Sequence, residues 1–121
     1  MKYEVRVAKR GTYVLMRPSE TTNWQDIVEH LAEAAQIAAA HNLRSFLIDV
    51  RDVASGFSTL EHYQIAHYEG RKLGFAAGSR IAVLVSPGDH SRDFVKTVVQ
   101  NAGYSCDLFE EEAAAEEWLE D

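Results

Sequence analysis

Serine, threonine and aspartate side chains gather in two short polar segments, each of which follows an apolar run. The first segment follows the run 46–50, and the second follows the run 81–85. In open α/β proteins, polar side chains at the carboxyl ends of neighbouring parallel strands meet at one edge of the sheet, where ligand crevices lie. The expected binding or regulatory residues are therefore Asp49, Asp52, Ser55, Ser58, Thr59, Asp89, His90 and Ser91.

Ser58 stands three residues before Glu61, and this spacing is typical of a capping box that opens a helix. A phosphoryl group on Ser58 would meet the free backbone N–H groups at a helix start, which suits a regulatory switch. A helix cap explains the same serine without any regulation. Both interpretations stay open at this point.

The segment 86–93 holds Asp89, His90 and Ser91 side by side, and these are the residue types of a hydrolase triad. Triad members normally come from separate segments, because adjacent side chains diverge in direction. Asp89 or Ser91 is instead expected to cap the helix that follows. A small hydrolase that uses the 86–93 loop is therefore the least favoured function.

The histidines and the single cysteine lack the spacing of a metal site or of a catalytic pair. His62 and His67 are five residues apart, so on a helix they would point to different sides. Cys106 has no neighbouring base in the sequence and is expected to be a packed or half-exposed thiol. We therefore expect no catalytic residue, no metal and no cofactor.

The elements that position these residues alternate along the chain. Charged and apolar residues alternate over 3–8, and a β-rich run follows Gly11 over 12–17, so the two predict an antiparallel hairpin. Further strands are predicted at 44–50, 81–85 and 104–109. Helical spacing of apolar residues predicts four helices, over 23–41 and 58–73, after the loop 86–91, and over 110–119.

The order ββαβαβαβα predicts one α/β domain over residues 1–121, with a mixed, mostly parallel five-stranded sheet. The apolar run 46–50 is the expected central strand, with Leu47 and Ile48 both buried. Asn42 and Gly103 stand where the first and third helices should end, because both residue types tolerate the left-handed backbone.

The predicted helix 58–73 carries more large apolar side chains than one face can hold. One stripe comprises Tyr63, Ala66, Gly70 and Leu73. Ile65 and Tyr68 lie on another stripe, and only one of the two can face the sheet. Ile65 and Tyr68 are therefore predicted interface residues, and a homodimer is the simplest assembly that would cover them.

Composition excludes several classes of protein. The chain has 121 residues, of which 46% are hydrophobic and 26% charged, and its formal charge of −7 repels nucleic acids. The start of the sequence has no signal-peptide pattern, and no apolar run approaches the roughly 18 residues that span a bilayer. Together with the single cysteine, this predicts a cytoplasmic protein that is not integral to a membrane.

An apolar strand ending in Asp49, followed by a serine-bearing loop that opens a helix, resembles the STAS family of anti-sigma factor antagonists and its SpoIIAA-like relatives. The stretches LIDVRDV, RIAVLVSPGDHSRDFV, NAGYSCDLF and EAAAEEWL are similar to a branch of small bacterial SpoIIAA-like (STAS/SEC14-type) proteins. The resemblance implies a non-enzymatic regulatory module that binds a protein partner and whose loop serine is phosphorylated. By position that serine is Ser58, with Ser55 as the nearby alternative and Asp49 as the strand-end carboxylate.

The SEC14-type relatives imply a second function, a carrier of a small apolar ligand or lipid. Its pocket would be lined by Phe57, Tyr63, Tyr68 and Phe75. This alternative ranks below the protein-binding module and above the hydrolase.

Overall fold

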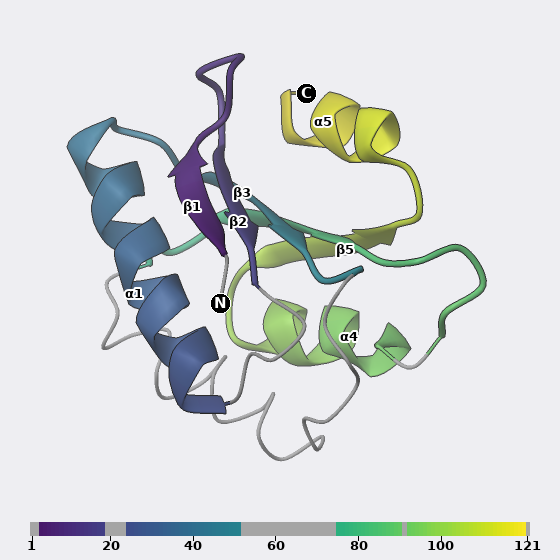
Figure 1. The fold of residues 1–121 in the computed structure, drawn as a ribbon. Helices are drawn as coiled ribbons and strands as arrows, with labels where there is room; N and C mark the ends of the chain where they lie inside the picture. Colours follow the sequence, from purple (N-terminus) through teal and green to yellow (C-terminus); the bar gives the residue numbers. More distant parts are fainter. Residues whose placement is uncertain (1–2, 19–23, 52–74, 91, 121) are drawn as a thin grey trace.

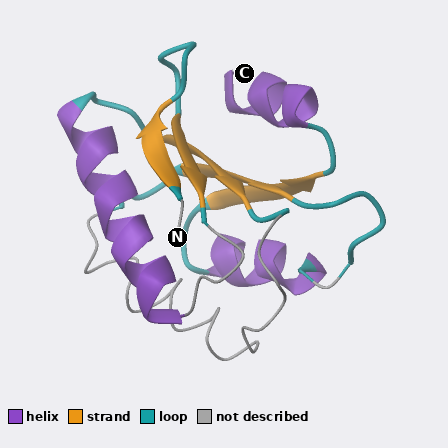
Figure 2. Cartoon of the chain, in the orientation of Figure 1, coloured by secondary structure: helices purple, strands orange, loops and turns teal. Residues whose placement is uncertain are grey.

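The computed structural model describes residues 3–18, 24–51, 75–90 and 92–120. In these ranges the chain forms five strands and three helices (Figures 1 and 2). In chain order they are β1 (Glu4–Val7), β2 (Val14–Arg17), α1 (Trp24–Ala40), β3 (Ser45–Asp49), β4 (Arg80–Leu84), α4 (Asp93–Asn101), β5 (Ser105–Phe109) and α5 (Glu112–Glu120).

The strands form one sheet in the order β1-β2-β3-β4-β5. β1 pairs antiparallel with β2, and every later pair is parallel. The predicted N-terminal hairpin and the mixed, mostly parallel five-stranded sheet are therefore confirmed. β3 is the central strand, as the sequence predicted.

The expected burial of the central strand is only half right. Leu47 has 0% of its surface exposed. Ile48 is half-buried, because it packs at the margin of two separate clusters of buried side chains instead of inside one. The prediction that both residues are buried is therefore wrong for Ile48.

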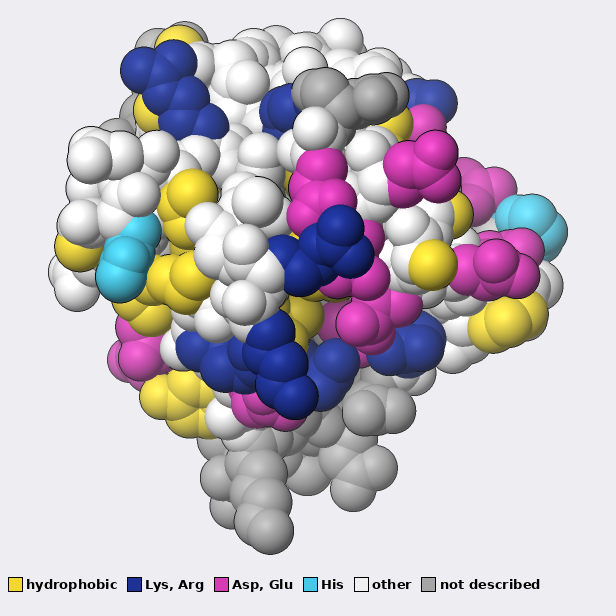
Figure 3. All heavy atoms as spheres, turned by 90° about the horizontal axis from the view of Figure 1, so that it is seen from above, with side chains coloured by type: hydrophobic (Ala, Val, Ile, Leu, Met, Phe, Trp, Pro, Cys, Tyr) yellow, Lys and Arg dark blue, Asp and Glu magenta, His cyan; other side chains and the backbone are white. Residues whose placement is uncertain are grey.

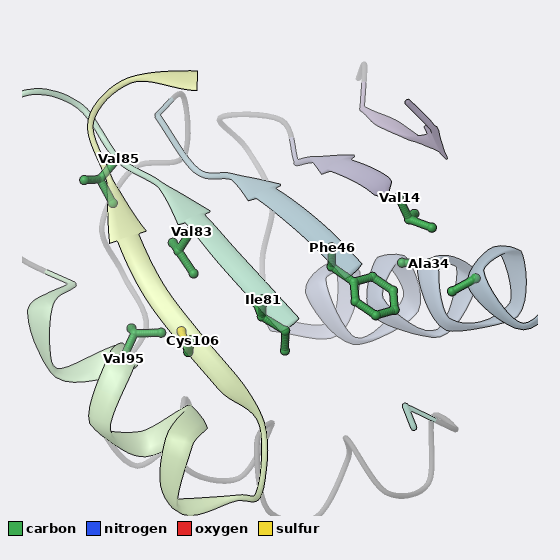
Figure 4. Close-up of a cluster of buried hydrophobic side chains, with 9 residues drawn as sticks. Val14, Ala34, Phe46, Ile81, Val83, Val85, Val95 and Cys106 are labelled. Atoms are coloured by element: carbon green, nitrogen blue, oxygen red, sulfur yellow. The ribbon is translucent and has the colours of Figure 1, made fainter. Parts of the chain in front are cut away.

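Helices cover both faces of the sheet. α1 and α4 lie on one face and α5 lies on the other (Figure 1). Because successive strand residues point to opposite faces, the core divides into layers. Figure 4 shows Phe46, Val83 and Cys106 in the layer beneath α1 and α4. The other layer packs Leu47 and Leu84 against α5.

The two helix ends predicted from residue type are confirmed. Beyond α1, Asn42 has a φ of 56°, and the Leu43 N–H donates to the Ala38 carbonyl over 2.8 Å. After α4, Gly103 has a φ of 102°. Both residues adopt the left-handed backbone that stops a helix, and glycine and asparagine do so at the least cost.

One predicted helix begins later than expected, and another falls in a part of the chain that the structure does not describe. The last helix starts at Glu112, two residues after the predicted start. The predicted helix 58–73, with the interface residues Ile65 and Tyr68, lies outside the described residues. None of the helices in the described ranges has the length and apolar character needed to cross a bilayer.

Candidate functional site

Five charged side chains meet on the α5 face at the carboxyl end of β2 and β3. We call them the arginine–carboxylate cluster; its members are Glu4, Arg17, Asp49, Arg51 and Glu112. Strand register explains the meeting, because Met16 pairs with Ile48 and the next residues along are Arg17 and Asp49. Glu4 pairs directly with Arg17 in the hairpin. Figure 3, viewed from the α5 side, shows basic and acidic side chains interleaved over the middle of this face.

Asp49 is the centre of the cluster, and its side chain is only 3% exposed. Arg17 Nε donates to Asp49 Oδ2 over 2.9 Å. The Arg51 guanidinium donates to both carboxylate oxygens, at 3.0 Å from Nε and 2.7 Å from Nη2. The backbone N–H of Arg51 donates to Asp49 Oδ1 over 3.1 Å. Charge-assisted, two-pronged bonds of this kind are the strongest that arginine makes.

The electrostatic balance at Asp49 favours the ionised form. Burial by itself would raise the pKa of this carboxyl group, but hydrogen bonds from Arg51 and Arg17 outweigh it and lower the pKa below its ordinary value of 3.8. Asp49 is therefore charged at neutral pH, and its oxygens already accept four hydrogen bonds. It is poorly suited to donate a proton or to hold a cation.

The two outer carboxylates are held less firmly. Glu4 accepts from Arg6 Nε and from Arg17 Nη1, each over 3.0 Å, and the Arg6 hydrogen bond is the main reason that its pKa is lowered. Glu112 Oε1 lies 3.6 Å from Arg51 Nη2 and 3.9 Å from Arg17 Nη2. Both distances exceed hydrogen-bonding range, so Glu112 is the loosest member of the cluster.

The second polar segment lies at the same edge of the sheet, as predicted. The Ser86 hydroxyl is 3.5 Å from the Arg51 carbonyl oxygen, so the segments that follow β3 and β4 are adjacent. His90 Nδ1 lies 3.2 Å from Asp93 Oδ2, and the His90 side chain is 78% exposed. The Asp93 side chain is 62% exposed, so both members of this pair lie on the surface.

The prediction that Asp89 caps the following helix is wrong. The N-cap position of α4 is Arg92, which makes no side-chain capping hydrogen bond. The Asp89 N–H donates to the Ser86 carbonyl over 3.0 Å, so a turn occupies this part of the loop and delays the helix start to Asp93. Ser91, the other predicted cap, lies outside the described residues.

Most of the predicted switch lies outside the part of the chain that the structure describes. This applies to Asp52, Ser55, Ser58 and Thr59. Of the four aromatic residues predicted to line an apolar pocket, Phe75 is described. Its ring packs 4.8 Å from Phe46 and 6.2 Å from Tyr104, between centroids, and it contributes to the core.

Two other groups that catalysis commonly uses are enclosed by the core. Cys106 is 2% exposed, and burial raises the pKa of its thiol to about 12. His30 is 5% exposed and stacks on Tyr3 with ring centroids 3.9 Å apart. Within the described ranges, no group of three or more His, Cys, Asp or Glu side chains is arranged to hold a metal ion.

Sequence reasoning singled out Asp49 but missed its arginine partners. A signal was present, because Arg17 ends the second predicted strand as Asp49 ends the third. Neighbouring parallel strands bring such end residues together. Arg51, two residues beyond Asp49, was the second basic residue in reach.

Comparisons with models of known protein families, with curated proteins and with solved structures found no match. The fold and the site therefore define the class of this protein. It is an α/β protein with a mixed, mostly parallel five-stranded sheet and an ion-paired cluster at the carboxyl edge of its central strands.

Proposed function

We propose that this protein is a non-enzymatic regulatory module of the STAS/SpoIIAA-like type, which binds a protein partner through the loop and helix that begin near Ser58. The observation that carries the proposal is the pair of hydrogen-bonded ion pairs that Arg17 and Arg51 make with Asp49. These ion pairs fix the backbone at the end of β3, where the chain enters that loop. A rigid scaffold below a variable loop is the usual arrangement of a binding surface.

The described titratable groups support a binding role over catalysis. The pKa of Asp49 is lowered because two guanidinium groups bind its carboxylate, so this side chain is ionised at neutral pH and cannot act as a general acid. The thiol of Cys106 is protonated at neutral pH because burial raises its pKa to about 12. His90 pairs with Asp93 on the surface. These groups do not converge on one point, as nucleophile and base must.

The partner class follows from charge. A formal charge of −7 opposes contact with nucleic acids and anionic membranes, so a protein partner is the better candidate. A cytoplasmic location is part of the same proposal. The order of the described elements along the chain is the order from which the STAS-like resemblance was inferred, apart from the predicted loop and helix at 52–74, which lie outside the described residues.

The test is partner capture from the native host with three baits, namely wild type, Ser58→Ala and Ser58→Asp, followed by mapping of phosphorylation sites. Ser58→Asp should retain the fold, because aspartate also caps helices, and should lower partner recovery on the order of tenfold. Ser105→Asp is the matched control, since Ser105 is an exposed serine on β5 and the charge change is the same. Equal recovery with all baits would leave Ser58 only a capping role.

A further inference from the structure

The helix α5 is attached to the rest of the protein by few buried side chains. Of its nine residues, Ala115 and Leu119 are buried. Among the described helices, α5 alone covers its face of the sheet (Figure 1). The larger buried cluster joins the sheet to α1 and α4, and none of its described members comes from α5. The sheet can therefore keep most of its core when α5 leaves it.

Three glutamates spaced four residues apart lie along one face of α5. We call Glu112, Glu116 and Glu120 the glutamate stripe. Like charges at this spacing destabilise a helix, and acidic residues in a last turn that holds no basic residue oppose the helix dipole. A nine-residue helix is also too short to be stable in water by itself. Undocked, α5 should therefore lose its helical structure.

Donors on the β1–β2 hairpin compensate for the charge of the glutamate stripe. Arg10 Nε and Thr12 Oγ1 donate to Glu120 over 2.6 Å and 2.9 Å. The Tyr13 hydroxyl donates to Glu116 over 2.7 Å, and burial is the main reason that the pKa of Tyr13 is raised, so this hydroxyl stays protonated. We call these three residues the hairpin donors. Helix formation and docking of α5 therefore depend on the same contacts.

We propose that α5 is a detachable cover, which opens as one unit while the sheet, α1 and α4 stay folded, and that the hairpin donors set how often it opens. In the open state α5 is not helical. The sheet face that carries Leu47 and Leu84 is then exposed in a protein whose other core layer is intact. Elements that move in conformational switches come from such regions of low local stability.

The test is native-state hydrogen exchange, followed by NMR amide by amide, under conditions in which the rates report opening equilibria. The amides from Ala115 onward should share one protection factor, because the helix opens as a unit. This factor should be at least about tenfold lower than those of β3 and β4. A protection factor that falls steadily along α5 would show fraying from one end and would overturn the proposal.

A first pair of variants tests the hydroxyl contact. Tyr13→Phe retains the buried ring but removes the donor to Glu116, and should speed exchange of the α5 amides by about tenfold, because a hydrogen bond to a charged acceptor is lost. Tyr3→Phe is the matched control, since Tyr3 is 45% exposed and precedes β1. It should leave the α5 rates unchanged.

A second pair tests the ion pair without touching the core. The Arg10 side chain is 59% exposed, so Arg10→Gln removes the charge with little loss of packing and should speed α5 exchange by about two- to fivefold. Lys9→Gln removes the same charge from the same turn and should have no effect. Unchanged α5 rates in both Arg10→Gln and Tyr13→Phe would overturn the role of the hairpin donors.

A substitution in the other core layer separates local opening from global unfolding. Val95 belongs to the larger buried cluster, so Val95→Ala should speed exchange in β3 and β4 several-fold by destabilising the whole fold. The α5 amides should keep their wild-type rates, because they exchange through an opening that leaves this cluster intact. Equal acceleration of α5 and β3 would show that α5 opens only when the protein unfolds, and would overturn the proposal.

Discussion

The carboxylate of Asp49 is buried, whereas both guanidinium groups that bind it reach solvent. This difference in exposure determines how much stability the protein loses when the charge of Asp49 is removed. Asp49→Asn should lower the free energy of unfolding by about 2 to 3 kcal/mol, below the 3 to 5 typical of fully buried pairs, because Arg17 and Arg51 can turn to water. Urea denaturation at neutral pH measures the change. Asp93→Asn, on an exposed carboxylate, should stay within about 0.5 kcal/mol.

The lowered pKa of Asp49 also predicts how the free energy of unfolding depends on pH. The pKa of Asp49 is lowered in the fold, so its contribution is fully present above its ordinary pKa of 3.8 and is lost as the pH falls through the folded value. Wild type should therefore lose stability below about pH 4 more steeply than Asp49→Asn does. Part of the slope will remain in the variant, because the pKa of Glu4 is lowered too. Parallel curves for the two proteins would contradict the ion-pair account.

Among the elements, the central strand β3 offers a comparison between two adjacent residues. Leu47 is fully enclosed, and Leu47→Ala should cost about 2 to 5 kcal/mol through the cavity it leaves. Ile48 is half-buried, so Ile48→Ala should cost less, about 1 to 2 kcal/mol. Thermal or urea unfolding of the two variants gives the order. A larger loss at Ile48 would mean that the α1 face bears more of the core than the structure indicates.

The short helix α5 depends on contacts that reach it from the hairpin. Glu120 accepts hydrogen bonds from Arg10 Nε over 2.6 Å and from Thr12 Oγ1 over 2.9 Å. The Tyr13 hydroxyl donates to Glu116 over 2.7 Å. A helix of this length is marginal in water, so tertiary contacts must stabilise it. The turn between β1 and β2 thus helps to hold α5 against the core layer that contains Leu47 and Leu84.

At the scale of the whole molecule, side chains protect an edge of the sheet. In β5, Cys106 and Leu108 alternate with the residues that bond to β4, so their backbone groups face outward. Gln100 Nε2 donates to the Cys106 carbonyl over 3.2 Å, and the Leu108 N–H donates to Asp107 Oδ1 over 2.9 Å. Edges covered in this way resist pairing with another sheet. Self-association through the β5 edge is therefore disfavoured, and a surface away from this edge is the better candidate.

The predicted helix 58–73 is the candidate surface for that association. Sedimentation at micromolar concentration should report a homodimer, because leaving Ile65 and Tyr68 in water would forgo about 1.5 to 3 kcal/mol each. Tyr68→Glu should give a monomer of unchanged helicity. Tyr3→Glu is the matched control, since Tyr3 is 45% exposed and lies outside this stripe. A monomeric wild type would assign the stripe to a foreign partner or to the core.

Local patterns were sufficient to predict most of the described fold. The hairpin around Gly11, the helix that ends before Asn42 and the apolar strand around Leu47 all follow from residues close together in the sequence. The start of α4 could not be predicted in this way. It depends on a turn that ties Asp89 to Ser86, and several residues nearby were equally good caps by type.

The sequence by itself determined the order of the described elements and the edge at which the polar segments meet, because periodicity and turn residues act over a few residues. Only the tertiary structure decided what Asp49 does. Its partner Arg17 is 32 positions away in the chain, and the two meet because β2 and β3 align in one particular parallel register. Register depends on how whole faces of strands pack, and a one-residue slip would turn Asp49 to the opposite face of the sheet.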